Sequence, residues 1–504
     1  MGALSAIRIL RLDPRDNVAV ALVRLALGTT VEQTAIVQPV PAGHKVAMVA
    51  IGLGEPVVKD GAVVGYASAD IPSGGHVHGG NVRPGAAEPG RLAQPVAAFA
   101  QHGPATFQGF VRADGRVGTR NTIGVFVVGN CGATAARKAA DWFDEDRLAD
   151  YPNVDAVVPY VHELGCGMEM TGEPMDLLRR TISGFIRNPN TAGGVVVALG
   201  CERNNLRGFL EQERLACGER LQTVTIQEVG GIANTVETVK HMVLAMLPEA
   251  NRARRETVGA EHLVLGLKSG APDGFSGLSA NPALGAAVDL LVAAGGTAIL
   301  AETPELAGVE HELTARAASP EIGAQLTERL AWWRQYSAGK DTQANGRVNP
   351  ANETAGLLNI VEKSVDGVKK AGHSPLTAVY RYAEPVTARG LVFMDTPGYD
   401  PVSVTGQIAG GATLIAYTTG LGSVFGSLPA PTVKLASNSE TFARMADDTD
   451  IDCGPVLDGS ASIADMGQRI FDQLLRHASG EKTKAEIDGV GENEFVPWPI
   501  GVLA

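Results

Sequence analysis

The chain has 504 residues, of which 61 are glycine, and its formal net charge is −13. Its length predicts two to four domains, while the hydrophobic fraction of 45% and the absence of a glycine repeat exclude wholesale disorder and a collagen-like fold. A net acidic chain without a basic run is unsuited to bind nucleic acid, and no apolar run approaches the length of about 18 residues that a membrane span needs.

Residues 1–84 are expected to form a small β-rich domain. Short apolar runs at 19–23, 45–49 and 62–66 are separated by turn-forming clusters of glycine, proline and aspartate. Residues 85–106 are rich in alanine, proline and glycine without a sustained periodicity, which predicts a linker.

From residue 107 onward, strand-like runs alternate with helical patterns, which predicts an α/β body with largely parallel sheets. A charged stretch at 249–256 divides this body into domains over 107–255 and 256–504. The expected strands are 123–128, 154–161, 194–199, 262–267, 297–301, 390–394 and 412–417, and the expected helices are 135–143, 175–186, 206–216 and 283–294. The expected fold class is a multidomain α/β protein with a small N-terminal β-domain.

The five cysteines are too few, and odd in number, to form a disulfide framework in so long a chain. Charged residues such as Arg8, Arg11 and Asp13 interrupt any apolar segment of an N-terminal signal peptide. We therefore expect a cytoplasmic protein from a reducing compartment, with no membrane contact.

Three cysteines follow predicted strands of the body, in loops flanked by glycine: Cys131, Cys166 and Cys201. Ligands bind beyond the carboxyl ends of parallel strands, and His162 and Glu202 stand in the same loops. Thiolate and imidazole suit iron or zinc, so these loops are a candidate metal site. The alternative is that the cysteines are small buried hydrophobic residues, since no CxxC pair is present.

A pair of histidines in the β-domain, His76 and His78, is separated by one residue. On a strand both side chains point to one face, where two imidazoles can share a metal or a carboxylate. The alternative is an exposed polar strand face.

The glycine-rich loops do not match a nucleotide-binding fingerprint. Residues 419–426 contain G-x-G-x-x-x-G, one residue longer than the dinucleotide motif, and no P-loop is present. A nicotinamide oxidoreductase is therefore disfavoured. Backbone N–H groups in such loops bind anions, so an acidic chain can still hold a carboxylate.

Several motifs occur in order along the chain: Asp70-Ile71-Pro72, His76-Val77-His78, Gly165-Cys166-Gly167-Met168, Leu199-Gly200-Cys201-Glu202, Glu302-Thr303-Pro304-Glu305, Glu362-Lys363-Ser364, and residues 114–121, 273–277 and 394–401. With them the chain resembles the altronate/galactarate dehydratase family of sugar-acid hydro-lyases from about residue 8 to residue 501. The resemblance implies an N-terminal β-clip domain of the SAF type, a large α/β body, and a divalent metal, Fe²⁺ or else Mn²⁺.

The family reaction dehydrates an aldonate or aldarate, such as altronate or galactarate, to its 2-keto-3-deoxy acid by C2 proton abstraction and loss of the C3 hydroxyl. The candidate metal ligands are His76, His78, Cys131, Cys166 and Cys201. The candidate catalytic residues are His162, Glu202 and His76. The candidate substrate-binding residues are Asp16, Asn17, Arg116, Arg120, Asn121 and Asp273, with structural ion pairs as the alternative for the arginines. We expect a small-molecule sugar acid as the substrate, no nucleic-acid or membrane partner, and a homo-oligomer, a dimer, as the assembly.

Three positions depart from the family pattern. Gly80 stands where the family often has a third histidine, Ser269 where it often has a cysteine, and Leu421 where it often has an arginine. These departures keep two alternatives open: a C–S lyase acting on sulfolactate with the same scaffold, and a non-catalytic paralogue that binds sugar acids.

Overall fold

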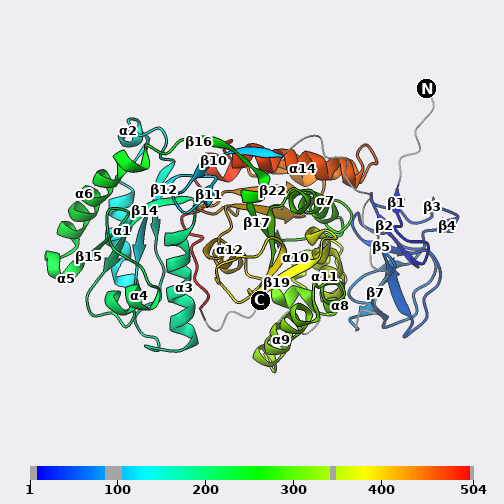
Figure 1. Cartoon of the computed structure of the whole chain (residues 1–504). Coiled ribbons are helices and arrows are strands. Elements are labelled where there is room, and N and C mark those ends of the chain that lie inside the picture. Colours follow the sequence, from blue (N-terminus) through cyan, green and yellow to red (C-terminus); the bar gives the residue numbers. More distant parts are fainter. Residues whose placement is uncertain (1–7, 86–104, 341–347, 500–504) are drawn as a thin grey trace.

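The computed structural model describes residues 8–85, 105–340 and 348–499. Figure 1 shows an N-terminal β-domain at one end, a second domain with a four-stranded sheet at the other, and a C-terminal domain with a seven-stranded sheet between them. The expected multidomain α/β class is therefore confirmed. The predicted linker over 85–106 lies almost entirely outside the described residues. Among the described helices, none is both long and apolar enough to cross a bilayer.

The β-domain consists of two small antiparallel sheets and a hairpin. One sheet has the order β1 (Ile9–Leu10), β2 (Val18–Ala21), β5 (Lys45–Ala47) and β8 (His76–Val77); the other has β6 (Pro56–Lys59), β7 (Ala62–Ala67) and β9 (Val82–Arg83); the hairpin is β3 (Thr30–Val31) and β4 (Thr34–Ala35). The pairing of β5 with β8 sets Val46 opposite His76. This register brings the start of β5 beside the histidine pair found in the sequence.

The second domain is built on a parallel sheet with the order β13-β12-β14-β15. Its elements are β12 (Thr122–Val127), α1 (Ala133–Ala140), α2 (Glu145–Leu148), β13 (Ala156–Tyr160), α3 (Glu173–Arg187), β14 (Thr191–Ala198), α4 (Leu206–Gln212), β15 (Leu221–Thr225), α5 (Ile226–Val229) and α6 (Ile232–Ala250). The expected elements are all present, with ends shifted by a few residues. The helix at 206 ends earlier than expected because Arg214 adopts a left-handed φ of +50°, which does not continue a helix.

The C-terminal domain has a wholly parallel sheet with β17 near its centre. The order is β19 (Leu376–Tyr380), β20 (Gly390–Met394), β18 (Thr297–Leu300), β17 (Val264–Gly270), β21 (Leu414–Thr419), β22 (Thr432–Ala436) and β23 (Ile451–Asp452). The helices are α7 (Ala280–Ala293), α8 (Glu310–Thr314), α9 (Pro320–Ser337), α10 (Pro350–Thr354), α11 (Ile360–Val368), α12 (Asp400–Ala409), α13 (Ser439–Arg444), α14 (Ile463–Ala478) and α15 (Lys484–Ile487). The chain runs to one side of β17 and returns to the other with β21, which creates a crevice at the carboxyl ends of these strands.

Two further features tie the second and C-terminal domains together. A small sheet, β11 (Val117–Gly118), β10 (Thr106–Val111) and β16 (Arg255–Gly259), pairs the strands that begin and follow the second domain. The C-terminal segment returns to the second domain, where the Phe495 ring lies 4.6 Å from that of Phe185, while Trp498 stacks at 5.4 Å on Trp333 of the C-terminal domain. The last described residues thus complete the packing of both domains.

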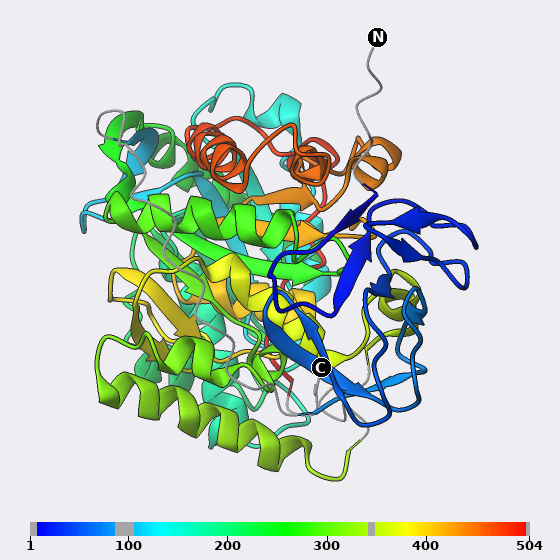
Figure 2. The same cartoon turned by 90° about the vertical axis from the view of Figure 1, so that its right-hand side faces the viewer.

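Figure 2 shows the β-domain in front of the C-terminal domain. A chain of alternating charged side chains joins the two domains. We call it the interdomain ion chain, and its members are Lys45, Lys59, Asp60, Glu362, Asp366 and Lys369. Glu362 Oε1 lies 2.5 Å from Lys45 Nζ and 3.1 Å from Lys59 Nζ, and all three side chains are buried. Burial opposes ionisation of Glu362, but the two lysines outweigh it and lower the pKa of the carboxyl group. Charges buried this fully are stable only when each keeps its partner.

We expect Glu362→Gln to lower the free energy of unfolding by about 3–5 kcal/mol, because it leaves Lys45 and Lys59 buried without their shared carboxylate. The matched control is Glu249→Gln, which removes an exposed pair with Arg252 and should leave stability nearly unchanged. Urea unfolding of both variants measures the difference. Equal stability of the two variants would contradict a structural role for the interdomain ion chain.

Candidate functional site

Three histidines of the β-domain lie together where this domain meets the C-terminal domain: His44, His76 and His78, the histidine cluster. The rings of His44 and His76 are 4.8 Å apart, and those of His76 and His78 are 4.7 Å apart. The sequence pattern placed His76 and His78 on one face, and the rings are neighbours. It missed His44, which joins them through the pairing of β5 with β8.

Hydrogen bonds fix the protonated nitrogens of this cluster. The Thr354 carbonyl oxygen can only accept, so His44 Nε2 donates to it at 2.9 Å, and His44 Nδ1 then accepts from His76 Nε2 at 2.8 Å. His76 Nδ1 therefore carries a lone pair. Burial lowers the pKa of His44, and burial with the neighbouring histidines lowers that of His76 to about 4. Both imidazoles are neutral at pH 7, which is the form that binds a metal.

Glycines allow the two domains to meet backbone to backbone beside the cluster. Gly43 has a φ of +81°, and a Cβ there would lie 3.0 Å from the Ala355 carbonyl oxygen. A Cβ on Gly274 would lie 1.9 Å from the Gly43 carbonyl oxygen. No side chain fits at this contact without a shift of the backbone. The contact holds the histidine cluster against α10.

A cavity of about 310 Å³ opens at the carboxyl edge of the seven-stranded sheet. We call it the carboxyl-edge cavity, and α10 links it to the histidine cluster, because Thr354 contacts His44 while Ala351 and Asn352 line the cavity. Its other lining residues come from the end of β17, from α11, from the start of α12 and from loops that include those after β17, β18, β20 and β21: Ser269, Gly270, Ala271, Pro272, Pro304, Glu305, Asn349, Lys363, Gly398, Tyr399, Asp400 and Leu421. The position agrees with the rule that α/β folds bind ligands at this edge.

Six charged side chains are packed at and below this cavity, and we call them the lysine–carboxylate network: Lys268, Glu302, Glu305, Lys363, Lys370 and Asp400. Lys268 Nζ bonds to Glu302 and lies 2.8 Å from Asp400 Oδ1. Tyr417 donates its hydroxyl to Asp400 Oδ2 at 2.7 Å. Asp400 thus presents a carboxylate to the cavity with both oxygens held by donors.

The network separates the pKa values of two neighbouring carboxyl groups. Burial and the nearby charge of Glu305 raise the pKa of Glu302. Burial also opposes the charge of Glu305, but Lys363 and the other lysines outweigh it and lower that pKa. Burial disfavours the ammonium of Lys268, yet Asp400 and Glu302 hold its pKa well above the usual value. Neighbouring carboxyl groups whose pKa values are shifted in opposite directions are typical of acid–base sites.

Two residues at this edge adopt left-handed backbone conformations although they are not glycine. Glu302, which follows β18, has a φ of +73°, and Ala271, which follows β17, has a φ of +47°. Such conformations cost free energy and concentrate where function requires a fixed geometry. The strain at Glu302 supports the carboxyl-edge cavity as the candidate active site.

Three cysteines lie at the carboxyl edge of the four-stranded sheet in the second domain, and two of them are in contact. Cys131 Sγ and Cys166 Sγ are 3.9 Å apart, and Cys201 Sγ accepts from Gln227 Nε2 at 3.7 Å. Burial and the contact with Cys131 raise the pKa of Cys166, so its thiol is protonated at neutral pH. We call these side chains the thiol cluster.

The structure corrects the expectation that histidines and thiols of one chain converge on a single metal. The histidine cluster belongs to the β-domain and the thiol cluster to the second domain, at opposite ends of the molecule (Figure 1). Over the described ranges, no three histidine, cysteine or acidic side chains already surround a common point suited to a metal. Metal binding therefore stays a prediction, for His76 and His78 in one place and for Cys131, Cys166 and Cys201 in another.

His162 is buried, and the backbone holds its imidazole ring in place. Its Nε2 donates to the Val127 carbonyl at 3.0 Å, and its Nδ1 accepts from the Leu164 N–H at 3.1 Å. Burial lowers its pKa to about 4. Because both ring nitrogens are bound to the backbone, we revise His162 from a catalytic to a structural residue.

Glu202 keeps one oxygen, Oε1, buried and without a hydrogen bond in the part of the chain described, so it stays a candidate beside the thiol cluster.

Most candidate substrate-binding residues are also held by the protein. All five N–H groups of Arg120 donate within the chain, two of them to the Glu486 carboxylate and the rest to backbone carbonyls. The Asn121 amide accepts from Arg112 and donates to two carbonyls. We therefore assign both residues to the joint between the domains rather than to substrate.

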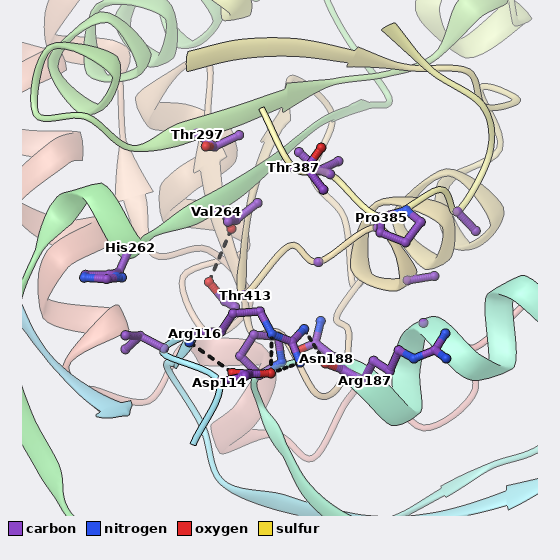
Figure 3. A pocket seen from close by; sticks show the side chains of 18 of the residues that line it. Asp114, Arg116, Arg187, Asn188, His262, Val264, Thr297, Pro385, Thr387 and Thr413 are labelled. Atoms are coloured by element: carbon purple, nitrogen blue, oxygen red, sulfur yellow. Dashed lines mark hydrogen bonds and ion pairs between the residues drawn. The ribbon is translucent and has the colours of Figure 1, made fainter. Parts of the chain in front are cut away.

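The same revision applies to three acidic and amide residues. Asp16 accepts from three backbone N–H groups, and Asn17 bridges two backbone groups of β6. Asp273 is buried and accepts from Ser276, Ser437 and Asn438. Each of the three stabilises a turn or a loop. Arg116 differs, because it is exposed and lines a second cavity, shown in Figure 3; its role stays a prediction.

Comparison with known proteins identifies the family. Family models match the altronate/galactarate dehydratase SAF domain over residues 7–84, the second domain of D-galactarate dehydratase/altronate hydrolase over 109–251, and the D-galactarate/altronate dehydratase C-terminal region over 260–503. The chain belongs to the altronate/galactarate dehydratase family. The resemblance found in the sequence is thus confirmed, and the β-domain is the SAF domain.

Relatives of this altronate/galactarate dehydratase family member include three enzymes at about one-third identity. It is 33% identical to galactarate dehydratase (L-threo-forming) from Escherichia coli K12 over 89% of this chain and 87% of that enzyme. It is 31% identical to altronate dehydratase from the same organism, over 94% and 96% of the two chains. The beta subunit of (2R)-sulfolactate sulfo-lyase from Chromohalobacter salexigens is 30% identical over 78% of this chain and 96% of that subunit. This family member is a lyase, as expected.

We expect burial of neutral His162 to make the free energy of unfolding of this family member depend on pH. As the pH falls from 6.5 to 4, this contribution of His162 to stability is lost. Its pKa is about 4 in the folded chain and about 6.5 when unfolded, so the unfolded state binds the proton first as pH falls. The contribution is complete above pH 6.5, and about 3 kcal/mol of it is lost by pH 4. His162→Gln should flatten the urea-unfolding profile in this window, while His241→Gln, at an exposed histidine, should not. Parallel profiles for the wild type and His162→Gln would refute the assignment.

Proposed function

We propose that the chain is a metal-dependent dehydratase that converts a sugar acid, an aldonate or aldarate such as altronate or galactarate, to its 2-keto-3-deoxy acid. The reaction removes the C2 proton and expels the C3 hydroxyl. The observation that carries the proposal is the joint placement, on the two sides of α10, of the histidine cluster and the carboxyl-edge cavity. The identity of 33% to galactarate dehydratase supports the substrate class.

The donor chemistry of the histidine cluster fits a divalent metal. Neutral imidazoles bind Fe²⁺ and Mn²⁺, and His76 Nδ1 is left with a lone pair by the hydrogen bond from His76 Nε2 to His44. His76 and His78 would hold the ion. When bound, it would act as a Lewis acid on substrate oxygens. Cys131, Cys166 and Cys201 supply softer ligands and form a separate candidate set in the second domain.

Asp400 is the group best placed to abstract the C2 proton. It lines the carboxyl-edge cavity and is the first residue of α12, directly after the loop that follows β20. Lys268 and Tyr417 hold one oxygen each, which fixes the orientation of the carboxylate. Lys363, which also lines the cavity and lies 2.6 Å from Glu305, supplies positive charge for the carboxylate of the substrate. General bases in such positions typically contribute about 10²–10⁴ in rate.

The second candidate function is C–S cleavage of sulfolactate. The 30% identity to a sulfolactate sulfo-lyase subunit favours it, and both reactions start with removal of a proton beside a carboxylate. The two differ in the leaving group. In the assay below, sulfite released from sulfolactate would identify the lyase, and tight binding of sugar acids without turnover would identify a non-catalytic paralogue.

We expect His76→Ala to lower the amount of bound metal. The chain is purified anaerobically, loaded with Fe²⁺ or Mn²⁺ and desalted, and the metal is counted by inductively coupled plasma mass spectrometry. His241→Ala, which removes an exposed histidine of α6, should retain the wild-type metal content. An unchanged metal content in His76→Ala would show that the histidine cluster is not the metal site. The thiol cluster would then be tested with Cys166→Ser.

We expect Asp400→Asn to lower kcat/KM for the best sugar acid by about 10²–10⁴, because the amide cannot accept the C2 proton. Formation of 2-keto-3-deoxy acid from altronate and from galactarate measures the rate. Asp472→Asn, at an exposed position of α14, is the control and should keep full activity. Full activity of Asp400→Asn would exclude Asp400 as the base, whereas no turnover of any sugar acid by the metal-loaded wild type would overturn the proposed function itself.

A further inference from the structure

A second cavity, of about 490 Å³, lies between the second and C-terminal domains. We call it the interdomain cavity. It is lined by the turn between β10 and β11, the last half of α3, the loop between β19 and β20, and the first residues of β17 and β18. In Figure 3, Asp114, Arg116 and Asn188 lie on one side of it, and Thr297 and Thr387 lie on the other. The cavity sits at the amino edge of the seven-stranded sheet, opposite the carboxyl-edge cavity.

Arginines dominate the charged lining of this cavity: Arg116, Arg180, Arg187 and Arg389 face the carboxylates of Asp114, Glu213 and Glu261. Three of the arginines donate to backbone carbonyls, Arg116 to Arg187 at 2.7 Å and Arg389 to Glu261 at 2.9 Å among them. A carbonyl oxygen orients a guanidinium but does not neutralise it. Arg116 is also paired with Asp114 at 2.6 Å, and Arg187 lies 3.8 Å from Glu213. The positive charge offered to a ligand therefore comes mainly from Arg180 and from Arg389, which donates to two carbonyl oxygens.

Among the described residues, Arg180 has a donor atom without an acceptor. Its Nε atom is buried and has no hydrogen-bond partner in the described part of the chain, and the carboxylate of Glu384 approaches its Nη1 only to 3.8 Å. Burial lowers the pKa of its guanidinium, although the charges of Glu384 and Glu213 oppose this shift. A buried donor without an acceptor is unfavourable, so a ligand anion that accepts from this guanidinium would gain a charge-assisted hydrogen bond.

The rest of the lining suits an organic molecule rather than a bare ion. Apolar surface comes from Pro385, Val386 and Ala409, and hydroxyl groups come from Thr297 and Thr387. The volume lies within the range of small-molecule sites. The cavity can thus contact the carbon skeleton, the hydroxyl groups and the anionic groups of a small organic ligand.

We propose that the interdomain cavity is a second ligand site, for a small organic anion carrying carboxylate or phosphate groups, with Arg180 as its principal contact. The strand β17 begins in this cavity at Val264 and ends in the carboxyl-edge cavity at Ser269 and Gly270, about 20 Å away at the usual rise per residue. A ligand here contacts both domains and the strand that leads to the candidate active site. The proposal is independent of the proposed reaction, because it concerns binding and needs no turnover.

Calorimetric titration of the full chain with tartrate and, separately, with inorganic phosphate tests the site. At least one probe should bind the wild type, and the probe that binds tells carboxylate from phosphate recognition. Arg180→Gln should weaken binding at least about tenfold, and Thr387→Trp, which fills the cavity from an exposed loop, should abolish it. Arg207→Gln, at an exposed arginine of α4 outside the cavity, should bind as the wild type does.

Three outcomes would overturn the proposal. These are binding of neither probe, binding that Arg180→Gln and Thr387→Trp leave unchanged, and binding that is lost in Asp400→Asn instead, which would place the probe in the carboxyl-edge cavity. Thermal unfolding without ligand shows whether each variant is folded, and Thr387→Trp retains the test if Arg180→Gln unfolds.

Discussion

The interdomain ion chain determines where the SAF domain sits. The side chains of Lys45 and Lys59 extend from the β-domain and are buried against Glu362 and Asp366 of α11. Taking these charges out of water is costly, and the cost is recovered only when every ammonium meets its carboxylate. Other docked arrangements leave a buried charge without a partner, so the pairing selects one orientation. That orientation brings His44 to the Thr354 carbonyl, and the histidine cluster thereby reaches α10 and the carboxyl-edge cavity.

The carboxyl edge of the seven-stranded sheet holds a second set of buried charges. Lys268 is fully buried between Glu302 and Asp400, and Glu302 holds its place in a strained backbone conformation. A network of this kind keeps its geometry because each member restrains the next. It is therefore suited to transfer protons at a fixed place. Arg120 and Asn121 have equally rich hydrogen bonding, but they line neither of the two cavities described above.

The sequence predicted the fold well where the pattern is local. Valine-rich runs such as 123–128 are buried on both faces of a sheet, and the strand at 390–394 has the expected ends. β22 was missed, because Lys434 interrupts its apolar run although the side chain is buried. Strand-end positions border the carboxyl-edge cavity, and the motif at 302–305 contains two carboxyl groups of the lysine–carboxylate network.

Periodicity carries no information on which domains dock, so it could not separate the histidines from the thiols. It also could not distinguish an arginine that binds a ligand from one whose five donors are all used within the chain, as those of Arg120 are. Both distinctions depend on contacts between residues hundreds of positions apart, which a single sequence does not display.

The placement of Phe495 has a consequence for synthesis of the chain on the ribosome. This ring packs on Tyr160 and Phe185, so the core of the second domain contains a side chain that is translated after every strand of the seven-stranded sheet. The domain over 122–251 emerges early but lacks this part of its interior until the C-terminal domain has been made. Domains usually fold in order as they leave the ribosome. Here the packing of the second domain is completed by a residue that follows the sheet of the C-terminal domain, so its completion depends on prior synthesis of that sheet.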